Sequence, residues 1–357
     1  MLSPTEGRSH PHADYNTRDR FGQVRFPVSF PASVFQLHGV NEAGEVVLRR
    51  QLRRAALLAF LSELPACRIG MEACASAHDW GRRISAMGHD VRLIAPAYVK
   101  PYVKRQKNDA ADAEAICEAV LRPGMGNVPI KSEEQQGCLM LHRSRDLLMR
   151  QRTMLLNAMR SHLAEFGIVL PQGPARIIAF MKGLRESGHP DLPDGAVLAM
   201  DVMSSQLDVL ATGIHAIERK LLAWHRDNAV SQRLETIPGV GLITATALAA
   251  SVGDPEAFRS GRHFAAFLGL VPRQTSSGGK ERLGRITKMG NSYLRRLLVI
   301  GATSVVRRAG ACTTGTGAWL RHLLERKPAR LVTVAMANKT ARIAWAIMAH
   351  GEEYRAA

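Results

Sequence analysis

The chain has 357 residues, of which 46% are hydrophobic, so it can bury an ordinary core in two or three domains. Lysine and arginine outnumber aspartate and glutamate by 48 to 31, and the formal net charge of +17 makes nucleic acid the first partner to expect. No apolar run reaches the roughly 18 residues of a membrane-spanning helix, so we expect no membrane partner. The five cysteines have no paired spacing, which predicts core thiols in a reducing cytosol.

The first 26 residues are a polar mixture without the apolar core of a secretory signal, and we expect a disordered arm there. Residues 34–40 alternate as a strand does and are followed by a turn at 41–44 and a second β-rich run at 45–48, which predicts a hairpin. A short strand at 68–71, a helix at 78–87, a strand at 91–95 and a helix at 109–121 follow. This alternation predicts an α/β domain over residues 27–125.

Apolar residues recur at three- and four-residue intervals over residues 133–166, which predicts a long amphipathic helix. A second seam, from Leu207 to Trp224, has heptad spacing. The two helices would form either an antiparallel hairpin or a dimer stalk, with residues 171–193 as the connection between them. This helical hairpin or coiled-coil segment covers residues 126–228.

Residues 229–357 are predicted to be mostly α-helical and to open with a helix-hairpin-helix-like element. Gly239 and Gly241 lie in the predicted turn, and Thr244 follows at the start of a small-residue helix. Exposed backbone N–H groups at such a helix start can bind a phosphate without sequence preference. A tight turn between two helices, without any ligand, is the alternative.

Carboxylates in the first domain form a candidate metal site. Asp109 and Asp112 lie three apart on one helix face, and Glu72 ends a buried strand, where a carboxylate is costly without a partner. Such oxygens suit Mg²⁺ or Mn²⁺, which can assist phosphoryl transfer. A solvated helix start that carries aspartates is the alternative for Asp109 and Asp112.

A candidate nucleophile lies in the last domain. Ser276 and Ser277 precede two glycines, so they can lie on an exposed turn that a phosphodiester can reach. Between residues 259 and 296 cations far outnumber the one acid, Glu281, and such a patch would position a phosphate. The residues expected to bind nucleic acid there are Arg273, Lys280, Arg282, Arg285, Lys288, Arg295 and Arg296. The alternative is a polar loop on a DNA-binding face without chemistry.

Four motifs resemble insertion-sequence transposases of the IS110 family, IS1111 subgroup. They read VFQLHGV from Val34, GMEAC from Gly70, KNDAADA from Lys107 and EFGI from Glu165. The resemblance implies a RuvC-like, ribonuclease-H-like N-terminal domain with a DEDD acidic set, in which Glu72, Asp109 and Asp112 take the last three places. It also implies that the essential serine of a C-terminal transposase domain is Ser277, with Ser276 as the alternative. Asn338 and Lys339 match that domain as well, in a helix that we interpret as structural.

The first aspartate of the acidic set does not carry over. Counting back without a gap places Ser29 at its position, and serine supplies no anionic ligand. Pro27 and Pro31 are poor residues for a central strand, so the segment is typical of a disrupted start joined to an intact remainder. Asp14 or Asp19 would substitute only if the arm folds back.

The resulting hypothesis is a transposase in which Ser277 attacks a DNA phosphodiester while a metal held by the acidic set assists, the two domains forming one composite site. The resemblance implies DNA, an element-encoded structured RNA as guide and a homo-oligomer, dimer or tetramer, in the bacterial cytoplasm at the nucleoid. One rival is a metal-only junction nuclease, and the other is a catalytically impaired transposase remnant that only binds nucleic acid.

Overall fold

The computed structural model describes residues 25–29, 34–41, 43–103, 109–122, 124–187, 192–311 and 315–355. It divides into two compact units, Met1–Ser132 and Glu133–Ala357, which we describe separately. Almost all of the expected disordered arm, together with Asp14, Asp19, Pro31 and Cys312, lies outside the described residues.

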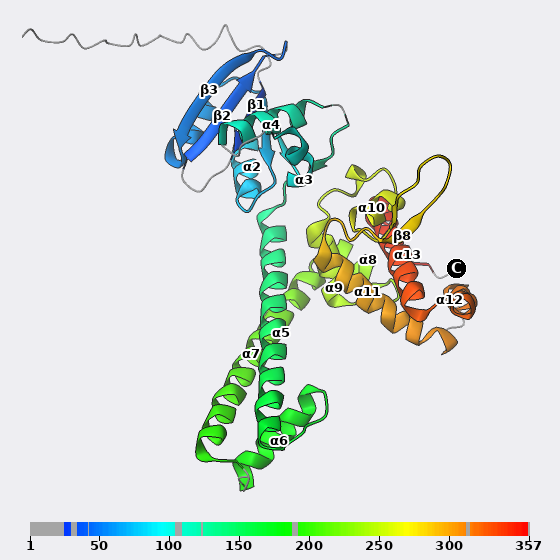
Figure 1. Cartoon of the computed structure of the whole chain (residues 1–357). Coiled ribbons are helices and arrows are strands. Elements are labelled where there is room, and N and C mark those ends of the chain that lie inside the picture. The colour runs from blue at the N-terminus through cyan, green and yellow to red at the C-terminus, as the bar shows by residue number, and fades with distance from the viewer. Residues whose placement is uncertain are drawn as a thin grey trace, which may run out of the picture. The chain divides into compact units, whose positions relative to one another are not determined.

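The first unit contains a six-stranded sheet in the order β3-β2-β1-β4-β5-β6 (Figure 1). Its strands are β1 (Arg25–Ser29), β2 (Val34–Val40), β3 (Val46–Arg53), β4 (Arg68–Glu72), β5 (Asp90–Ile94) and β6 (Asn127–Val128). β2 pairs antiparallel with β3, which confirms the predicted hairpin, and also with β1. β1, β4 and β5 run parallel to one another, and β6 returns antiparallel to β5.

The expectation that the prolines would keep this segment out of a central strand is wrong. β1 lies between β2 and β4, and Pro27 is in register with Gly70. A proline removes one backbone donor from the ladder, but the strand continues on both sides of it, with Phe26 opposite Ile69 and Val28 opposite Met71.

Helices of the first unit are α1 (Leu57–Ser62), α2 (Ala77–Ser85), α3 (Pro96–Val99) and α4 (Asp109–Leu121), with 3-10 turns at Arg54–Ala56 and Lys100–Tyr102. The bounds of α4 coincide with the prediction. α4 packs on β1, β2 and β4, and at Gly70 the approach is so close that an added Cβ would lie 2.3 Å from Val120 Cγ2. The buried core on β2 and α2 includes Phe35 and Trp80, whose rings meet edge to face.

The second unit begins with α5 (Glu133–Glu165) and α7 (Asp194–Arg226), which confirms both predicted long helices. They pack against each other within the chain (Figure 1). Cys138 near the start of α5 is clustered with Leu221 near the end of α7, and Met159 near the end of α5 with Met200 near the start of α7, so the two helices are antiparallel. Arg145 of α5 also donates to Glu218 of α7 at 2.8 Å. The hairpin alternative is therefore the one formed within a single chain.

The interpretation of residues 171–193 as a plain connection is wrong, because α6 (Pro174–Ser187) lies there. Ile177, Met181 and Leu184 have helical spacing and are buried in a cluster with Met159 of α5 and Met200 of α7. Burial of this apolar face stabilises a helix whose flanking Gly and Pro residues hide it in the sequence.

α7 is long and apolar enough to cross a membrane by length and composition, although polar residues interrupt its apolar ones in the sequence. Within the unit, its face carrying Leu207, Ile214 and Leu221 is buried.

The rest of the second unit is mostly helical, as predicted. It comprises α8 (Ala229–Glu235), α9 (Leu242–Ser251), a 3-10 turn at Pro255–Ala257, α10 (Gly261–Phe267), β7 (Pro272–Gln274), β8 (Leu283–Ile286), α11 (Ser292–Arg307), a 3-10 turn at Ala309–Ala311, α12 (Gly315–Arg326) and α13 (Ala329–His350). α8 and α9 lie where the helix-hairpin-helix-like element is predicted, with Gly239 and Gly241 in the turn between them. α11 and α13 pack together, with Leu298 and Met336 in one buried core.

A buried histidine joins α5 to this core. His142 is 1% exposed, and its two ring nitrogens lie 3.0 Å from the Tyr293 hydroxyl of α11 and 3.1 Å from the Thr246 hydroxyl of α9. Burial lowers the pKa of His142 from 6.5 to about 4 and raises the pKa of Tyr293. The long helix is thus tied to the serine-bearing domain through neutral polar groups.

Four of the cysteines are described, and each is a free thiol: Cys67, Cys74, Cys117 and Cys138. Burial raises the pKa of both Cys67 and Cys138 to about 12. Cys67, Cys117 and Cys138 are buried core thiols, as the sequence predicts, whereas Cys74 is half-buried.

Candidate functional site

The predicted serine turn is the tip of a β-hairpin formed by β7 and β8. The Lys280 backbone N–H donates to the Ser277 carbonyl at 3.1 Å, with Gly278 and Gly279 between them. Both glycines have positive φ, 56° and 76°. Two successive positive φ angles define the tight two-residue turn that favours glycine, so the Gly-Gly pair presents the serine at the apex.

The two candidate serines differ in their hydrogen bonds. The Ser276 hydroxyl oxygen accepts from the Arg282 backbone N–H at 3.2 Å and from the Gln274 side chain at 3.1 Å. Ser277 is exposed, and its hydroxyl makes no hydrogen bond to any part of the chain that the structure describes. Ser276 therefore braces the hairpin, and Ser277 is the hydroxyl available to a substrate.

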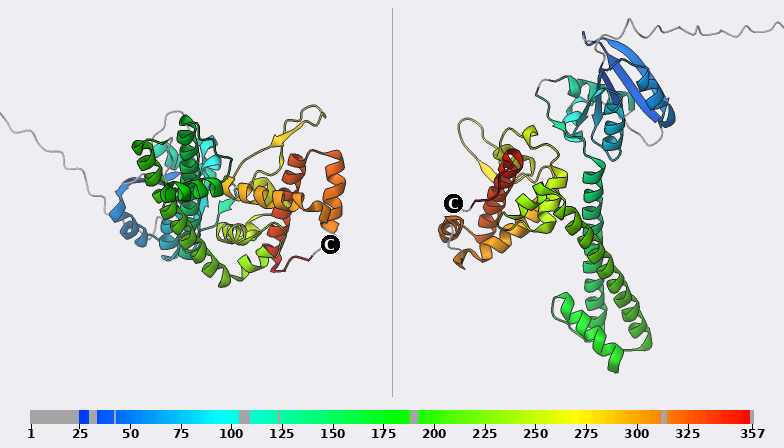
Figure 2. Two further views of the ribbon diagram at one scale, coloured as in Figure 1. Left: turned by 90° about the horizontal axis from the view of Figure 1, so that it is seen from below. Right: turned by 180° about the vertical axis from the view of Figure 1, so that it is seen from behind.

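The base of the hairpin is held firmly, while its tip projects from the helices (Figure 2). A Cβ at Gly290 would lie 1.8 Å from the Phe267 carbonyl oxygen, so the two backbones are in close contact. Arg295 donates to the Leu268 carbonyl at 2.9 Å and to the Met289 carbonyl at 2.7 Å. These contacts fix the direction in which the hairpin leaves the domain.

Five of the predicted cations are exposed on the hairpin or just beyond it: Arg273, Lys280, Arg282, Arg285 and Lys288. Two others interact with the protein itself. Arg295 bonds the two carbonyls above, and Arg296 pairs with Asp146 of α5 and lies 5.3 Å from the centre of the Tyr293 ring. The structure therefore gives Arg295 and Arg296 a packing role that the sequence pattern did not indicate.

The three residues predicted to bind phosphate in the helix-hairpin-helix-like element have different surroundings in the structure. Gly239 has a φ of +85°, and a Cβ there would lie 2.7 Å from Val305 and 2.8 Å from the Gly301 carbonyl of α11. Thr244 is 7% exposed, so its side chain does not reach a phosphate at the surface. Gly241 has open space around it and precedes the first residue of α9. We therefore withdraw Thr244 as a phosphate contact and assign Gly239 to packing.

The predicted acidic residues lie on two elements of the first unit. Glu72 ends β4, and Asp109 and Asp112 occupy the first turn of α4. In the described ranges no three His, Cys, Asp or Glu side chains are close enough to hold a metal, so the structure does not bring these three together as one ligand set. The backbone of β1 runs in parallel register with β4 up to Val28 and Met71. The next residues along these two strands are Ser29, where the resemblance expects an aspartate, and Glu72.

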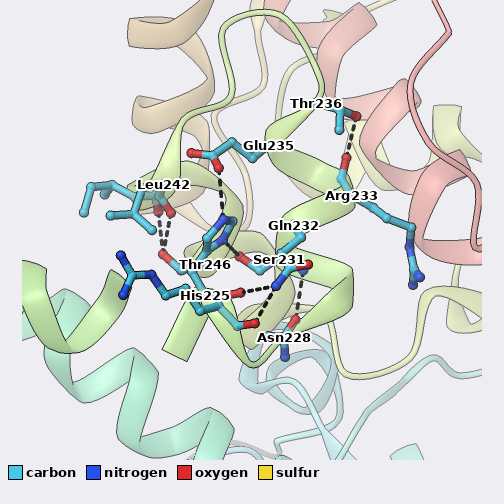
Figure 3. A network of polar contacts seen from close by, with 11 residues as sticks. His225, Asn228, Ser231, Gln232, Arg233, Glu235, Thr236, Leu242 and Thr246 are labelled. Carbon is cyan, nitrogen blue, oxygen red and sulfur yellow. Dashed lines mark hydrogen bonds and ion pairs between the residues drawn. The ribbon is translucent and has the colours of Figure 1, made fainter. Parts of the chain in front are cut away.

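A serine, a histidine and a glutamate also meet at the junction of α7 and α8 (Figure 3). His225 Nδ1 lies 2.8 Å from the Ser231 hydroxyl, and His225 Nε2 lies 2.9 Å from Glu235. The order resembles a nucleophilic triad, but Ser231 is 0% exposed. Its N–H is capped by Asn228 at 2.8 Å, and the group joins two helices instead of meeting a substrate.

Comparison with known proteins finds two transposase families that match this chain. Residues 34–168 match a DEDD transposase family, and residues 231–314, which include the hairpin, match a family described as "Transposase IS116/IS110/IS902 family". A probable family 20 transposase from Pseudomonas aeruginosa is 47% identical over 93% of this chain and 98% of its own length. The transposase for insertion sequence element IS1328 from Yersinia enterocolitica is 42% identical over 89% of this chain and 94% of its own length. The transposase for IS1111A from Coxiella burnetii is 39% identical over 92% of this chain and 90% of its own length.

The two matched regions define a DNA transposase with an acidic domain followed by a second transposase domain. The chain belongs to the IS110 family of insertion-sequence transposases. Its partner is therefore DNA, and the DEDD domain indicates use of a divalent metal.

Proposed function

We propose that this transposase cuts and joins DNA strands with Ser277 as the nucleophile. The free hydroxyl at the tip of a hairpin with a fixed base is the observation that supports this assignment most strongly. In the step, a bond forms between the Ser277 oxygen and phosphorus as the bond from phosphorus to a deoxyribose oxygen breaks. The serine proton passes to water, and the released oxygen takes up a proton. The number of phosphate ester bonds is unchanged, so the hydroxyl of a second strand can reverse the reaction and join to the phosphate.

Exposed cations on the same hairpin support this role. Arg273, Lys280, Arg282 and Arg285 surround the turn, and Glu281 is the one acid among them. Cations at this density bind the phosphates on either side of the attacked one and stabilise the charge that develops there. Lys288, and the backbone at Gly241 before α9, would add contacts at a distance from the tip.

We assign the first unit to the ribonuclease-H-like, RuvC-like class. Support comes from the strand order β3-β2-β1-β4-β5, with β2 antiparallel to its neighbours and β1, β4 and β5 parallel. In this class the acidic residues are expected at Glu72, Asp109 and Asp112, and at the position of Ser29. The residues present fit a divalent metal only in part, since the fourth place lacks a carboxylate.

Mg²⁺ or Mn²⁺ would supply charge stabilisation at a phosphate oxygen when bound there. The chain's own contribution is to hold Glu72 at the end of β4 and both aspartates on one face of α4. Restoring a carboxylate at position 29 would complete the set.

The remaining proposals follow from the family. They are an element-encoded structured RNA as guide, a dimer or tetramer as the working form, and a place in the bacterial cytoplasm at the nucleoid. The proposed boundaries are an arm at 1–26, an acidic domain at 27–125, a helical hairpin at 126–228 and a transposase domain at 229–357.

The serine assignment is tested by trapping a covalent protein–DNA adduct. Full-length protein is incubated with end-labelled element-junction DNA, the family's noncoding RNA and Mg²⁺, and then denatured. The assay is first run with the chain as it stands and with Ser29→Asp. Whichever of the two reacts is then compared with its Ser277→Ala variant and with its Ser276→Ala variant, the matched control. We expect the adduct to vanish in Ser277→Ala and to persist in Ser276→Ala, with the phosphate on the peptide that contains Ser277.

Two results would favour the rival functions. Metal-dependent cleavage that survives both serine substitutions, without an adduct, would identify a metal-only junction nuclease. Binding of DNA and RNA with no chemistry in any background would identify a transposase remnant.

A further inference from the structure

The second unit contains a hollow of about 1150 Å³. Its walls are the base of the β7–β8 hairpin, the start of α10, and parts of α12 and α13, and we call it the α13 groove. This volume exceeds the roughly 300–1,000 Å³ typical of small-molecule pockets. Its size therefore suits a segment of a polymer.

The groove is lined by cations. Arg262, Arg285, Lys339 and Arg342 line it, and the residues lining it include no acid. In the described part of the chain none of the four forms an ion pair with a carboxylate. Lys339 lies 4.7 Å from the centre of the Trp319 ring, which also lines the groove. Four cations around one hollow favour an anionic occupant.

Most of the remaining lining is apolar. Leu270, Val334 and Ile343 line the groove together with the rings of Trp319 and Trp345. The Trp345 ring N–H donates to the Pro255 carbonyl at 3.0 Å, which holds that ring in place. A lining that combines apolar and aromatic groups with cations suits a single strand, whose unstacked bases contact the apolar groups and whose phosphates contact the cations. A duplex would offer its phosphates but keep its base faces stacked inside.

The groove continues into the hairpin that carries Ser277. Pro272, Gly284, Arg285 and Ile286 line it and also belong to the base of that hairpin. Pro272 precedes Ser277 by five residues, which is about 16 Å of extended chain. A strand in the groove is therefore within a few nucleotides of the serine hydroxyl.

We infer that the α13 groove binds a single strand of DNA that flanks the phosphate attacked by Ser277. This inference rests on the proposed function for the choice of DNA over RNA, because the groove shares its wall with the hairpin of the proposed DNA nucleophile. Arg262, Lys339 and Arg342 contact phosphates, and the Trp319 and Trp345 rings contact sugars and bases.

The test is a binding measurement in the Ser277→Ala background, so that no reaction interferes. A short fluorescein-labelled oligodeoxythymidylate is titrated with full-length protein at several salt concentrations and followed by anisotropy. The groove variant is Lys339→Gln/Arg342→Gln. The matched control, Lys327→Gln/Arg330→Gln, removes the same charge from two exposed positions outside the groove, one just after α12 and one in α13. A second variant, Arg262→Gln/Arg285→Gln, removes two cations that line the groove from elements other than α13. It replaces the first groove variant in the test if that variant has a lowered melting temperature.

We expect the groove variant to bind about tenfold more weakly, with a log–log salt slope smaller by about 1.4 because two single-strand phosphate contacts are lost. The control should change affinity by less than about threefold. Equal effects in the groove variant and the control would overturn the inference, as would loss of binding to an oligouridylate alone. If Ser277 forms its adduct while the groove variant binds DNA like the control, the inference about the groove is refuted and the serine assignment stands. If no adduct forms but the groove effect stands, the serine assignment fails alone.

Discussion

Gly301 of α11 provides the most direct test of how the helix-hairpin-helix-like turn is packed. A Cβ at Gly301 would lie 1.9 Å from the Gly239 carbonyl oxygen, and the two backbones would have to separate by roughly 1 Å. Such overpacking typically costs about 1–3 kcal/mol and sometimes more. Alanine in place of glycine inside a helix returns about 1 kcal/mol. Because the clash is with backbone and not with a flexible side chain, we expect the cost to be at the upper end, about 3 kcal/mol. After the gain of about 1 kcal/mol, Gly301→Ala should lower the free energy of unfolding by about 2 kcal/mol.

Gly137→Ala is the matched control. Gly137 is also inside a helix, α5, but it is exposed and nothing lies within 4 Å of an added Cβ. This substitution should raise the free energy of unfolding by about 0.5–1 kcal/mol. The assay is urea unfolding of the full chain followed by circular dichroism and tryptophan fluorescence. A Gly301→Ala protein stabilised as much as the Gly137→Ala protein would refute the packing that we describe.

Three further predictions follow from contacts inside the two units. Burial lowers the pKa of His142 to about 4, so the unfolded state binds a proton first as the pH falls below 6.5. The free energy of unfolding, measured with urea, should therefore fall by about 2 kcal/mol between pH 7 and pH 5. This fall should be absent in His142→Phe and present in the exposed control His322→Gln. Gly70→Ala should lower the unfolding free energy by about 2 kcal/mol, and Val120→Ala should partly rescue it in a double-mutant cycle, because the added Cβ meets Val120 Cγ2 at 2.3 Å. Arg295→Gln removes two charged hydrogen bonds to carbonyls, so limited proteolysis within the hairpin should become faster and the melting temperature should fall.

Elements with a strong local pattern were predictable from the sequence. α4 and α5 were expected close to their observed bounds, and the predicted seam from Leu207 to Trp224 lies within α7, because helical periodicity and helix-ending residues act within a few turns. α6 was missed because glycine and proline residues flank it, and its apolar spacing gains meaning only against α5 and α7.

Roles that depend on distant contacts were not predictable. β1 is a strand because β2 and β4 pair with it on both sides, in spite of Pro27. Gly239 lies in a glycine-containing turn that is typical of phosphate binding, but in the structure it packs against α11, which is distant in the sequence. The same holds for Arg295, whose acceptors become visible only in the fold.

The candidate site was predictable in part. The serine turn follows from the Ser-Gly-Gly sequence, but the difference between Ser276 and Ser277 depends on hydrogen bonds across the hairpin. Lys339 was expected only as part of a structural helix, since nothing in the sequence places it beside Trp319 and Arg285.

We propose that the acidic set of this transposase lacks a carboxylate at position 29. The measurement that tests it most directly is Mg²⁺-dependent cleavage and strand exchange of element-junction DNA, with the noncoding RNA present, comparing the chain as it stands with Ser29→Asp. Since position 29 follows Val28 in a strand that pairs in register with β4, we predict that the Ser29→Asp protein reacts and that the unaltered chain does not. Equal activity of the two proteins would contradict the account, because another group would then complete the acidic set.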